Sequence, residues 1–396
     1  MGHGAKLSAL ILLAMLTAAP AISKQITVAD TQQLHAALQS LSLGDKIILA
    51  PARYRTHLLF TARHSGTQAL PVRLTARDGA GSAIIDGAGA DITVKFAGAA
   101  YIHLEGLDIT GGGYHGVFFS DGAHHIRVAG SRIYDNYAAR PLDSHAELKG
   151  TGPADNRPHH IAILDNEIFH SSHPPGGNFQ GIDCNFCDDF LISGNYLHDI
   201  RQPVSEPYSH YDRGSCIQMK SSSRNVVIER NKIAHCHIGI VYGGEGLASP
   251  EHIGGMVRNN LIYASGEIAI AVVNVHDGKI LHNTLYANAG AIRVARDQRN
   301  PESRNMVLIA NNILDGPVRI YSNGDNVMQQ ANHVLTREET ASLFINAAEY
   351  DFRLLPTATQ IIDKGAMSGG QVADDFAGTL RPKGAAADIG AYEYQP

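Results

Sequence analysis

The chain has 396 residues, of which 44% are hydrophobic and 18% are charged, and its formal net charge is −6. This hydrophobic content suffices for a large core, whereas the negative balance and the lack of any Lys/Arg block argue against a nucleic-acid-binding protein. The 40 glycines favour many tight turns between short apolar strands.

The first residues have the pattern of a secretory signal. Lys6 precedes the apolar run LSALILLAMLTAAPA, and Ala19-Pro20-Ala21 supplies the small residues of a cleavage site. We therefore expect residues 1–21 to be a signal peptide cleaved near Ala21, and the mature protein to be periplasmic or secreted. No later stretch is apolar over the length that a membrane-spanning helix needs.

An amphipathic helix is expected near the start of the mature chain. A short strand over 26–28 precedes it, Asp30 or Thr31 is its N-cap, and Leu34, Leu38 and Leu41 lie on one face. A second strand follows over 46–49. Because a stack of strands leaves an open apolar end, residues 22–60 are interpreted as its N-terminal cap.

A repeated turn organises the central part of the chain. A polar residue precedes an aliphatic step in seven similar short segments, at intervals of roughly 20 to 40 residues, which is typical of stacked structural units. Asn suits this place because it tolerates left-handed dihedral angles and because its amide can bond the Asn of the next turn. Residues 61–320 are therefore expected to form coils of parallel strands. The repeated positions are Ser131, Asn166, Asn195, Asn231, Asn260, Asn283 and Asn312.

Two terminal patterns resemble known proteins. The pattern V-x5-L-x2-A-L-x5-G-D-x-I-x-L-x4-Y from Val28 to Tyr54 resembles the opening of the right-handed parallel β-helix proteins of the pectate-lyase-like group. The pattern from Asp375 to Glu393 resembles the C-terminal end of many secreted bacterial β-helix proteins. The resemblance implies an all-β, right-handed parallel β-helix as a single domain over 22–396, with residues 321–396 covering the last coil.

Polar residues concentrate on two of the strands that follow the repeated turns. When Ile182 and Ile217 point inward, the alternation of a strand places Asp183, Asn185, Gln218 and Lys220 outward. Neighbouring coils are about 4.8 Å apart, so these four side chains would share one groove. Two long polar segments flank it and add His145, Glu147, Tyr208, His210, Tyr211, Asp212 and Arg213.

This arrangement suits the eliminative cleavage of a uronic acid. That reaction needs a group to neutralise the carboxylate, a base for the C5 proton and an acid for the leaving oxygen. Lys220 is the candidate base, Tyr211 or His210 the acid, and Arg213 a clamp for the carboxylate. We expect Gln218, His237, Tyr242 and Arg293 to bind substrate, and Asp183, Asn185 and Asp212 to offer oxygen ligands for Ca²⁺.

The segment from Lys220 to Gly244 resembles two groups of enzymes. It is similar to the catalytic coil of the chondroitinase B and alginate lyase group, where the lysine that matches Lys220 is the base, but Tyr242-Gly243-Gly244 replaces the Arg-His-Gly that supplies the acid. It also resembles polygalacturonases, although Asn178-Phe179-Gln180-Gly181 and Arg213-Gly214-Ser215-Cys216 lack their acids and only His237 remains. Because a hydrolase needs two carboxyl groups across the bond, the lyase interpretation ranks higher.

The sequence thus predicts an exported lyase for a uronate-containing, anionic polysaccharide. The alternatives are a non-catalytic carbohydrate-binding or surface protein, a glycoside hydrolase and a uronate C5-epimerase on the same fold. Four cysteines, Cys184, Cys187, Cys216 and Cys236, would pair in an oxidising compartment, or Cys184 and Cys187 would form half of a zinc site. Neither the disulfide pairing nor the oligomeric state follows from the sequence.

Overall fold

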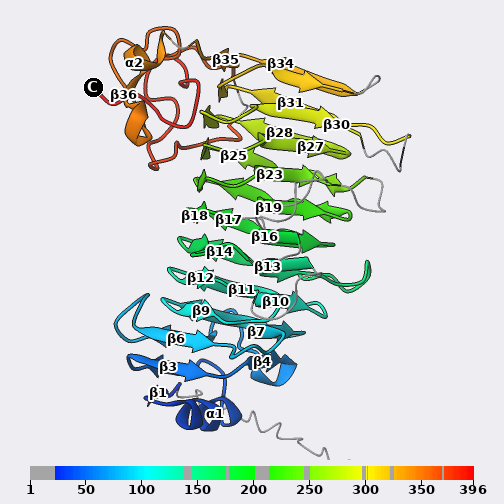
Figure 1. The fold of residues 1–396 in the computed structure, drawn as a ribbon, viewed down its shortest axis with the longest axis vertical. Coiled ribbons are helices and arrows are strands. Elements are labelled where there is room, and N and C mark those ends of the chain that lie inside the picture. The colour runs from blue at the N-terminus through cyan, green and yellow to red at the C-terminus, as the bar shows by residue number, and fades with distance from the viewer. Residues whose placement is uncertain are drawn as a thin grey trace, which may run out of the picture.

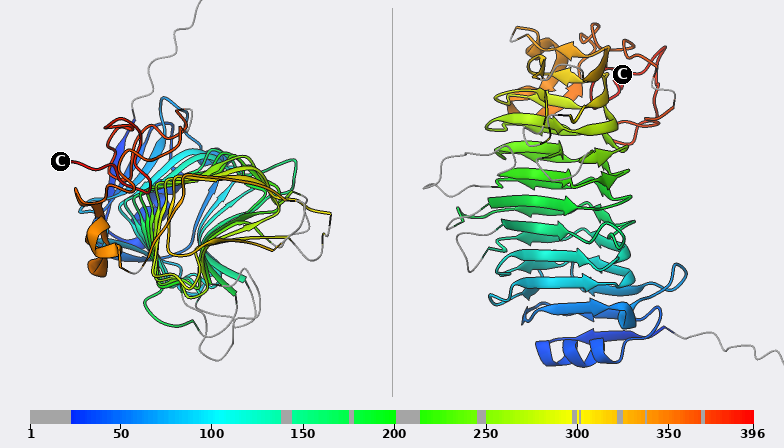
Figure 2. Two further views of the ribbon diagram at one scale, coloured as in Figure 1. Left: turned by 90° about the horizontal axis from the view of Figure 1, so that it is seen from above. Right: turned by 90° about the vertical axis from the view of Figure 1, so that its right-hand side faces the viewer.

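The chain winds into a column of stacked coils, each built from one strand of three parallel sheets (Figure 1). Seen along the column, the successive coils superpose (Figure 2). This is the right-handed parallel β-helix that the sequence predicts. The computed structural model describes residues 23–137, 144–174, 178–200, 214–244, 250–296, 300, 302–321, 325–336, 338–367 and 370–396.

Sheet C, the sheet that carries the candidate site, has a strict register between neighbouring coils. Val117, Leu148, Ile182 and Ile217 are paired in succession and buried inside the column, as alternation along a strand requires. Burial of such aliphatic columns on every coil supplies most of the core. In order, the strands are β4 (Leu58–Thr61), β7 (Ile92–Ala97), β10 (His115–Ser120), β13 (Ser144–Gly150), β16 (Asn178–Asn185), β19 (Ser215–Lys220), β23 (Ile238–Gly243), β27 (Ile268–Val273), β30 (Ile292–Ala295) and β33 (Val318–Ile320).

Strand β13 corrects one expectation from the sequence. From the sequence, residues 144–150 are expected in a polar loop beside the site, and the strands that contain Val117 and Ile182 are expected to be neighbours. The structure places a complete coil between these strands, because Leu148 pairs with both. His145, Glu147 and Lys149 therefore belong to sheet C.

Sheet A follows sheet C around each coil. Its paired aliphatic positions, such as Ile126, Ile163 and Ile192, also point into the core. Its strands are β1 (Gln25–Val28), β2 (Lys46–Leu49), β5 (Val72–Ala76), β8 (Ala100–Glu105), β11 (His124–Ala129), β14 (Ala162–Leu164), β17 (Leu191–Ser193), β21 (Val227–Glu229), β25 (Met256–Arg258), β28 (Val275–Leu281), β31 (Met306–Ala310) and β34 (Asn326–Gln330), with the short β20 (Ser223–Arg224) and β24 (His252–Ile253) at its side.

Sheet B completes each coil with short strands. Its central column, which includes Ile133, Ile168 and Leu197, is buried. Its strands are β3 (Ala52–Arg55), β6 (Ala83–Asp86), β9 (Asp108–Thr110), β12 (Arg132–Tyr134), β15 (Glu167–Phe169), β18 (Tyr196–His198), β22 (Lys232–Ala234), β26 (Leu261–Tyr263), β29 (Thr284–Tyr286), β32 (Ile313–Leu314) and β35 (His333–Val334).

The asparagine ladder lies in the turn between sheets A and B. In each step the Oδ1 of one Asn accepts hydrogen bonds from the backbone N–H and the Nδ2 of the Asn one coil earlier, as between Asn195 and Asn231 at 2.9 and 3.0 Å. The ladder runs from Ser131 to Asn332, one coil further than expected. The left-handed residue is the one before each ladder position, for example Arg230 with φ 53°, so the side-chain bonds and not the dihedral angle explain the recurrence of Asn.

A helix covers the N-terminal end of the column. Helix α1 (Thr31–Gln39) has Asp30 as its N-cap, whose side chain accepts from the N–H of Gln33 at 2.8 Å. Leu34 is fully buried against the first coil, and Leu38 and Leu41 pack beside it. No helix among the described residues has both the length and the apolar character that crossing a bilayer requires.

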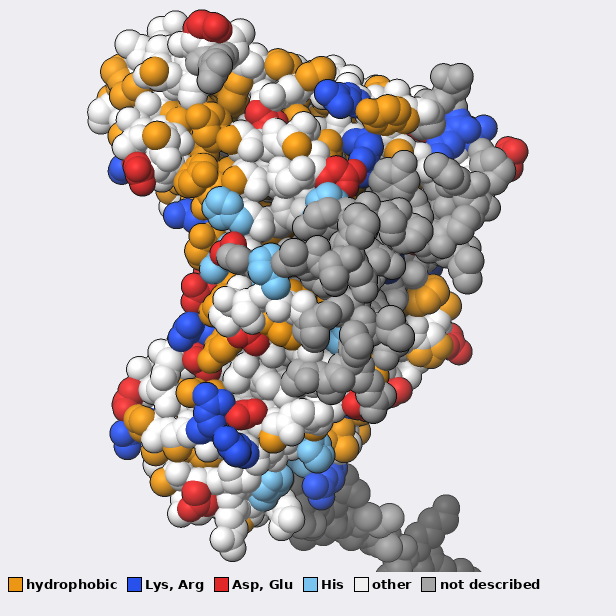
Figure 3. All heavy atoms as spheres, in the orientation of Figure 1, with side chains coloured by type: hydrophobic (Ala, Val, Ile, Leu, Met, Phe, Trp, Pro, Cys, Tyr) orange, Lys and Arg blue, Asp and Glu red, His pale blue; other side chains and the backbone are white. Residues whose placement is uncertain are grey.

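Within residues 321–396, strands β34 and β35 continue the column, and the later elements pack beside its upper coils (Figures 1 and 2). Tyr263 and Ile313 of sheet B are buried with Phe352 and Ile389 of this segment, and hydrophobic side chains gather on this upper part of the molecule (Figure 3). The Asn259 side chain donates to the carbonyl of Asp374 at 2.7 Å. The elements of this segment are the short α-helix α2 (Thr340–Leu343), strand β36 (Phe344–Asn346), the 3₁₀-helix η2 (Ala347–Glu349) and strand β37 (Asp351–Leu354). Strands β36 and β37 pair antiparallel. The chain has one earlier described 3₁₀-helix, η1 (Ala62–His64), which follows β4.

Candidate active site

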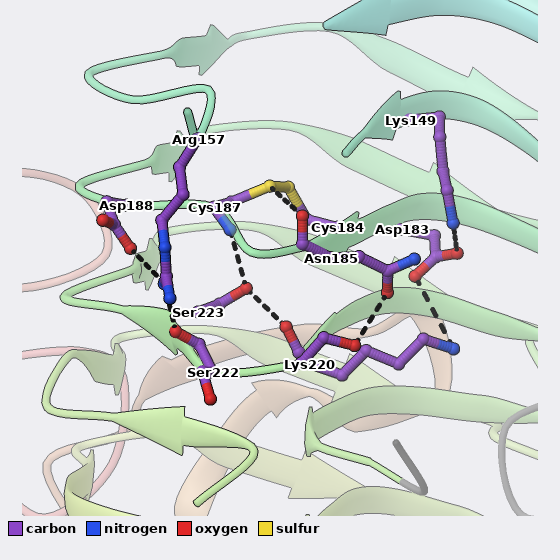
Figure 4. Close-up of a disulfide and its surroundings, with 11 residues drawn as sticks. Lys149, Arg157, Asp183, Cys184, Asn185, Cys187, Asp188, Lys220, Ser222 and Ser223 are labelled. Carbon is purple, nitrogen blue, oxygen red and sulfur yellow. Dashed lines mark hydrogen bonds and ion pairs between the residues drawn. A yellow bond between two sulfur atoms is a disulfide. The ribbon is translucent and has the colours of Figure 1, made fainter. Parts of the chain in front are cut away.

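A buried carboxylate between two lysines forms the centre of the candidate site, on the outer face of sheet C. Lys149 of β13 is paired with Asp183 of β16, and the neighbouring Asn185 is paired with Lys220 of β19. The Lys149 Nζ forms an ion pair with Asp183 Oδ2, and the Lys220 Nζ lies 3.9 Å from Asp183 Oδ1 (Figure 4). Asp183 and Lys220 therefore share one face, as the sequence predicts.

The electrostatics of the group follow from its burial. The side chain of Asp183 is only 2% exposed, whereas those of Lys149 and Lys220 are 11% and 15% exposed. Burial alone would raise the pKa of Asp183, but the charges of Lys149 and Lys220 and the hydrogen bond from Lys149 outweigh it and hold the pKa below its ordinary value. Asp183 is thus ionised at neutral pH and is the shared partner of the two lysines.

The turn after β19 fixes the backbone of Lys220. Ser221 and Ser222 both adopt left-handed conformations, with φ of 58° and 60°. The Ser223 Oγ donates to the Lys220 carbonyl at 2.6 Å and accepts from the Cys187 N–H at 3.0 Å (Figure 4). Through Ser223, the backbone of Lys220 is therefore hydrogen-bonded to the preceding coil.

The four cysteines form two disulfides beside this group. Cys184 is joined to Cys187, at the end of β16, and Cys216 of β19 is joined to Cys236. All four are buried in the core. Because each is paired, the half zinc site considered from the sequence is wrong, and the pairing agrees with an oxidising compartment.

Two glycines allow the chain to cross over the site after β23. A Cβ on Gly243 would meet the carbonyl oxygen of Val273 at 1.9 Å. A Cβ on Gly244, whose φ is +150°, would lie 3.1 Å from the Cβ of Lys220 and 3.2 Å from the Nε2 of Gln218. The backbone at Gly244 thus covers Gln218 and Lys220, which explains why Gln218 is fully buried although it points outward.

Two predicted substrate-binding residues are brought together elsewhere on the face. The Nε2 of His237 lies 2.8 Å from Glu267 Oε2, and Arg293 forms an ion pair with Glu267 Oε1. Burial would raise the pKa of Glu267, but the hydrogen bonds from His237 and Arg293 prevail and lower it to about 2. Arg293 shares the outward column of Asp183 and Gln218 but lies on β30, three coils beyond β19.

Tyr242 does not bind substrate, contrary to the expectation from the sequence. Its side chain is fully buried, it points into the core, and its hydroxyl donates to the carbonyl of Gly254. Burial raises the pKa of Tyr242 far above its ordinary value. The physical reason is alternation: its neighbour Val241 belongs to the outward column, so Tyr242 must face inward.

Several predicted residues fall outside the described part of the chain. These are His210, Tyr211, Asp212 and Arg213, together with Tyr208 and the signal peptide. The acid, the carboxylate clamp and one calcium ligand therefore stay predictions. The sequence analysis missed Lys149 and Glu267, and a search for the extra strand over 144–150 would have found Lys149.

The residues around Asp183 do not fit a calcium site. Both carboxylate oxygens face lysine ammonium groups, and Asn185 Oδ1 accepts from the Ser221 hydroxyl at 3.4 Å. A hard cation prefers several oxygen ligands without competing positive charge. Within the described ranges, no group of three or more His, Cys, Asp or Glu side chains is arranged to hold a metal ion.

Other proteins resemble this chain in fold and not in sequence. No family model matches the sequence, and no curated protein matches it. Pectate lyase Pel9A superposes with a TM-score of 0.64 over 94% of this chain and 97% of that chain, at 14% identity. The Dettilon tailspike protein gp208 has a TM-score of 0.52 over 77% of this chain and 64% of that chain, at 12% identity, and XylC with xylose has 0.52 over 82% and 79%, at 10%. These likenesses confirm the parallel β-helix fold.

Proposed function

We propose that the protein is an exported polysaccharide lyase that cleaves a uronate-containing chain by β-elimination, with Lys220 as the base. The observation that carries this proposal is the Lys149–Asp183–Lys220 group on the outer face of sheet C. The fold likeness to a pectate lyase over nearly the whole chain supports the class of substrate.

Lys149 and Lys220 contact Asp183 differently, and we assign them different roles. Lys149 is hydrogen-bonded to Asp183 and holds this carboxylate in place. Lys220 contacts Asp183 at 3.9 Å, beyond hydrogen-bond distance, so Asp183 does not fix the direction of its amine by a hydrogen bond. In the proposed step the neutral form of the Lys220 amine takes the C5 proton and becomes an ammonium group, the C4–C5 double bond forms and the C4–O bond breaks. The leaving oxygen takes its proton from an acid, for which His210 or Tyr211 stays the prediction.

The spacing of carboxyl groups disfavours hydrolysis. Asp183 and Glu267, two acids held by basic side chains on the outer face of sheet C, belong to coils three steps apart. At about 4.8 Å for each step they are roughly 14 Å apart. Glycosidases place their two carboxyl groups about 5 to 9.5 Å apart across the bond. Glu147 of β13, on the coil next to Asp183, is engaged by His170 and Asn136. Glu267 is moreover held by His237 and Arg293.

The test is to incubate the purified protein with polygalacturonate, alginate and chondroitin sulfate and to follow the ultraviolet absorbance of the unsaturated product. We expect absorbance to rise with one of them. Reducing ends without absorbance would establish a hydrolase, inversion at C5 without cleavage an epimerase, and retention of the polymer without turnover a binding protein. Each of these three results overturns the lyase proposal.

Variants of Lys220 separate its role from a structural one. Lys220→Arg keeps a positive charge beside Asp183 but supplies no neutral amine, so we expect a loss of at least a hundredfold in kcat with an unchanged melting temperature. Lys232→Arg, on the exposed face of sheet B, is the matched control. Full turnover by Lys220→Arg would show that another group is the base.

A further inference from the structure

The two ends of the column differ in how they are covered. Helix α1 lies against the first coil at the N-terminal end, where its Leu34 is fully buried (Figure 1). At the other end, no helix or strand of the described ranges lies across the last coil, because the elements after β35 pack against sheet B at the side (Figure 2). The last coil consists of β33, β34 and β35, and among the described strands each of these pairs on one side only. The C-terminal end therefore presents three free strand edges.

The inward side chains of the last coil are apolar and reach the surface. Ile320 pairs with Val294, and Val334 pairs with Leu314. Val294 and Leu314 are buried, whereas Ile320 and Val334 are 44% and 46% exposed. The other apolar inward positions of this coil, which are half-buried, are Val318 and Val327. The hydrophobic core thus meets solvent on the last coil, and a partner that covers it gains stability from the apolar area that it buries.

Exposed apolar side chains surround this end as well. Met328 of β34 and Tyr321, directly after β33, are exposed, and so is Met306 on the coil before. Contiguous exposed apolar surface marks an interaction site. An edge strand that stays free usually carries a charge, a proline or a bulge, each of which hinders pairing. Strand β34 reads Asn-Val-Met-Gln-Gln and pairs with β31 without a shift of register, so it has none of the three.

We infer that the last coil is a dimer interface, on which a second copy of this chain docks end to end about a two-fold axis. Helix α1 packs on β1 and β2 at the opposite end, so it blocks the first coil of one copy from stacking on the last coil of another. A contact between the same ends of two copies is isologous and closed, as in most soluble homodimers. The candidate site lies on β13, β16 and β19, away from this end, and the inference does not depend on the proposed function.

The sequence of β34 suits pairing with its own copy. The two-fold axis makes the facing strands antiparallel, and a pair centred on Met328 places Val327 opposite Gln329 of the second copy. Because β34 contains no charged residue, no like charges meet across the pair. Arg319 of β33 belongs to the outward column of Arg293, so its charge points away from the open core. The surface is thus compatible with an identical surface, as a two-fold interface requires.

Sedimentation and small-angle X-ray scattering of the mature protein measure this association. We expect a dimer about twice as long as one column and a melting temperature that rises with protein concentration. Ile320→Glu places an unpaired charge in the interface and should weaken association about a hundredfold. Because Ile320 is half-exposed in a single copy, the fold should persist. Leu59→Glu, at a similarly exposed position of β4 near the other end, is the control and should dimerise as the wild type does.

An exchange of charges tests the two-fold geometry. Met328→Lys and Met328→Asp each place like charges opposite one another and should weaken association about tenfold, whereas an equal mixture of the two should regain it. A wild-type protein that is monomeric at about 0.1 mM would overturn the interface, as would an Ile320→Glu variant that dimerises as tightly as Leu59→Glu. A dimer no longer than one column, or a mixture that associates no better than either Met328 variant alone, would overturn it as well.

Discussion

The Nζ of Lys220 lies 3.9 Å from the carboxylate of Asp183, a residue of the preceding coil that is buried and also paired with Lys149. The close approach of Lys149 and Lys220 is stabilised by this one negative charge. Without it, two ammonium groups with little exposure would face each other, and an uncompensated buried charge is costly.

Asp183→Asn is therefore expected to destabilise the fold. The amide keeps the size of the side chain but removes its charge, and we expect the free energy of unfolding to fall by about 3 kcal/mol in chemical denaturation. Asp78→Asn, which breaks an exposed pair with Arg77, should leave the stability nearly unchanged. Equal stability of Asp183→Asn and the wild type would show that the lysines do not need this charge.

Gly244→Ala is expected to disturb the site more than the fold. The new Cβ would press on the Cβ of Lys220 at 3.1 Å, and the φ of +150° is strained for alanine. We expect at least a tenfold loss of turnover in the absorbance assay, with a decrease of only a few degrees in the melting temperature. Gly316→Ala, where a Cβ meets no atom within 4 Å, should leave both unchanged.

Much of this architecture follows from the sequence, because the same turn and the same alternation of inward and outward residues recur on successive coils. Asn195 and Asn231 mark equivalent turns, and that equivalence fixes which strand residues point outward, including Asp183 and Lys220. The disulfide partners and the path of the C-terminal segment depend on contacts between distant parts of the chain, which no local pattern encodes.

The errors have equally specific causes. The coil of β13 carries its ladder residue, Asn166, but β13 itself lies within a long polar segment before that residue, so the sequence favours a loop there and Lys149 is missed. Tyr242 was selected for its residue type, although the alternation of its strand places it inside. The role of a residue inferred from its type alone is thus less reliable than its inward or outward position inferred from the alternation of the strand.

The ladder itself is open to a direct test with Asn231→Ala. This substitution leaves the backbone N–H and the Nδ2 of Asn195 without their shared acceptor, and each buried donor without a partner costs about 1 to 3 kcal/mol. We expect a loss of about 3 kcal/mol in the free energy of unfolding. Ser131→Ala at the end of the ladder removes the acceptor of one N–H, that of Leu107, and should cost about 1 kcal/mol. Equal losses for both would argue against the ladder as a source of stability.

The two disulfides should contribute unequally. Cys216 and Cys236 are separated by 20 residues, whereas Cys184 and Cys187 are separated by 3. Since closing a longer loop restricts the unfolded chain more, we expect the double variant Cys216→Ser/Cys236→Ser to lose about 3 kcal/mol and Cys184→Ser/Cys187→Ser about 2 kcal/mol. Denaturation of both variants under non-reducing conditions measures the difference, and the reverse order would contradict the assignment.

Glu267 should make stability depend on acid pH. Burial would raise the pKa of Glu267, but the hydrogen bonds from His237 and Arg293 outweigh it and lower the pKa from its ordinary value of 4.5 to about 2. A lowered pKa in the folded state means that the stabilisation is complete above pH 4.5 and is lost as the pH falls toward 2. Because the side chain is 30% exposed, solvent screening limits the effect to about 1 kcal/mol. Glu267→Gln should therefore be less stable than the wild type at pH 7, and the two should converge near pH 2. Parallel stability curves over this range would show that Glu267 is not held by His237 and Arg293.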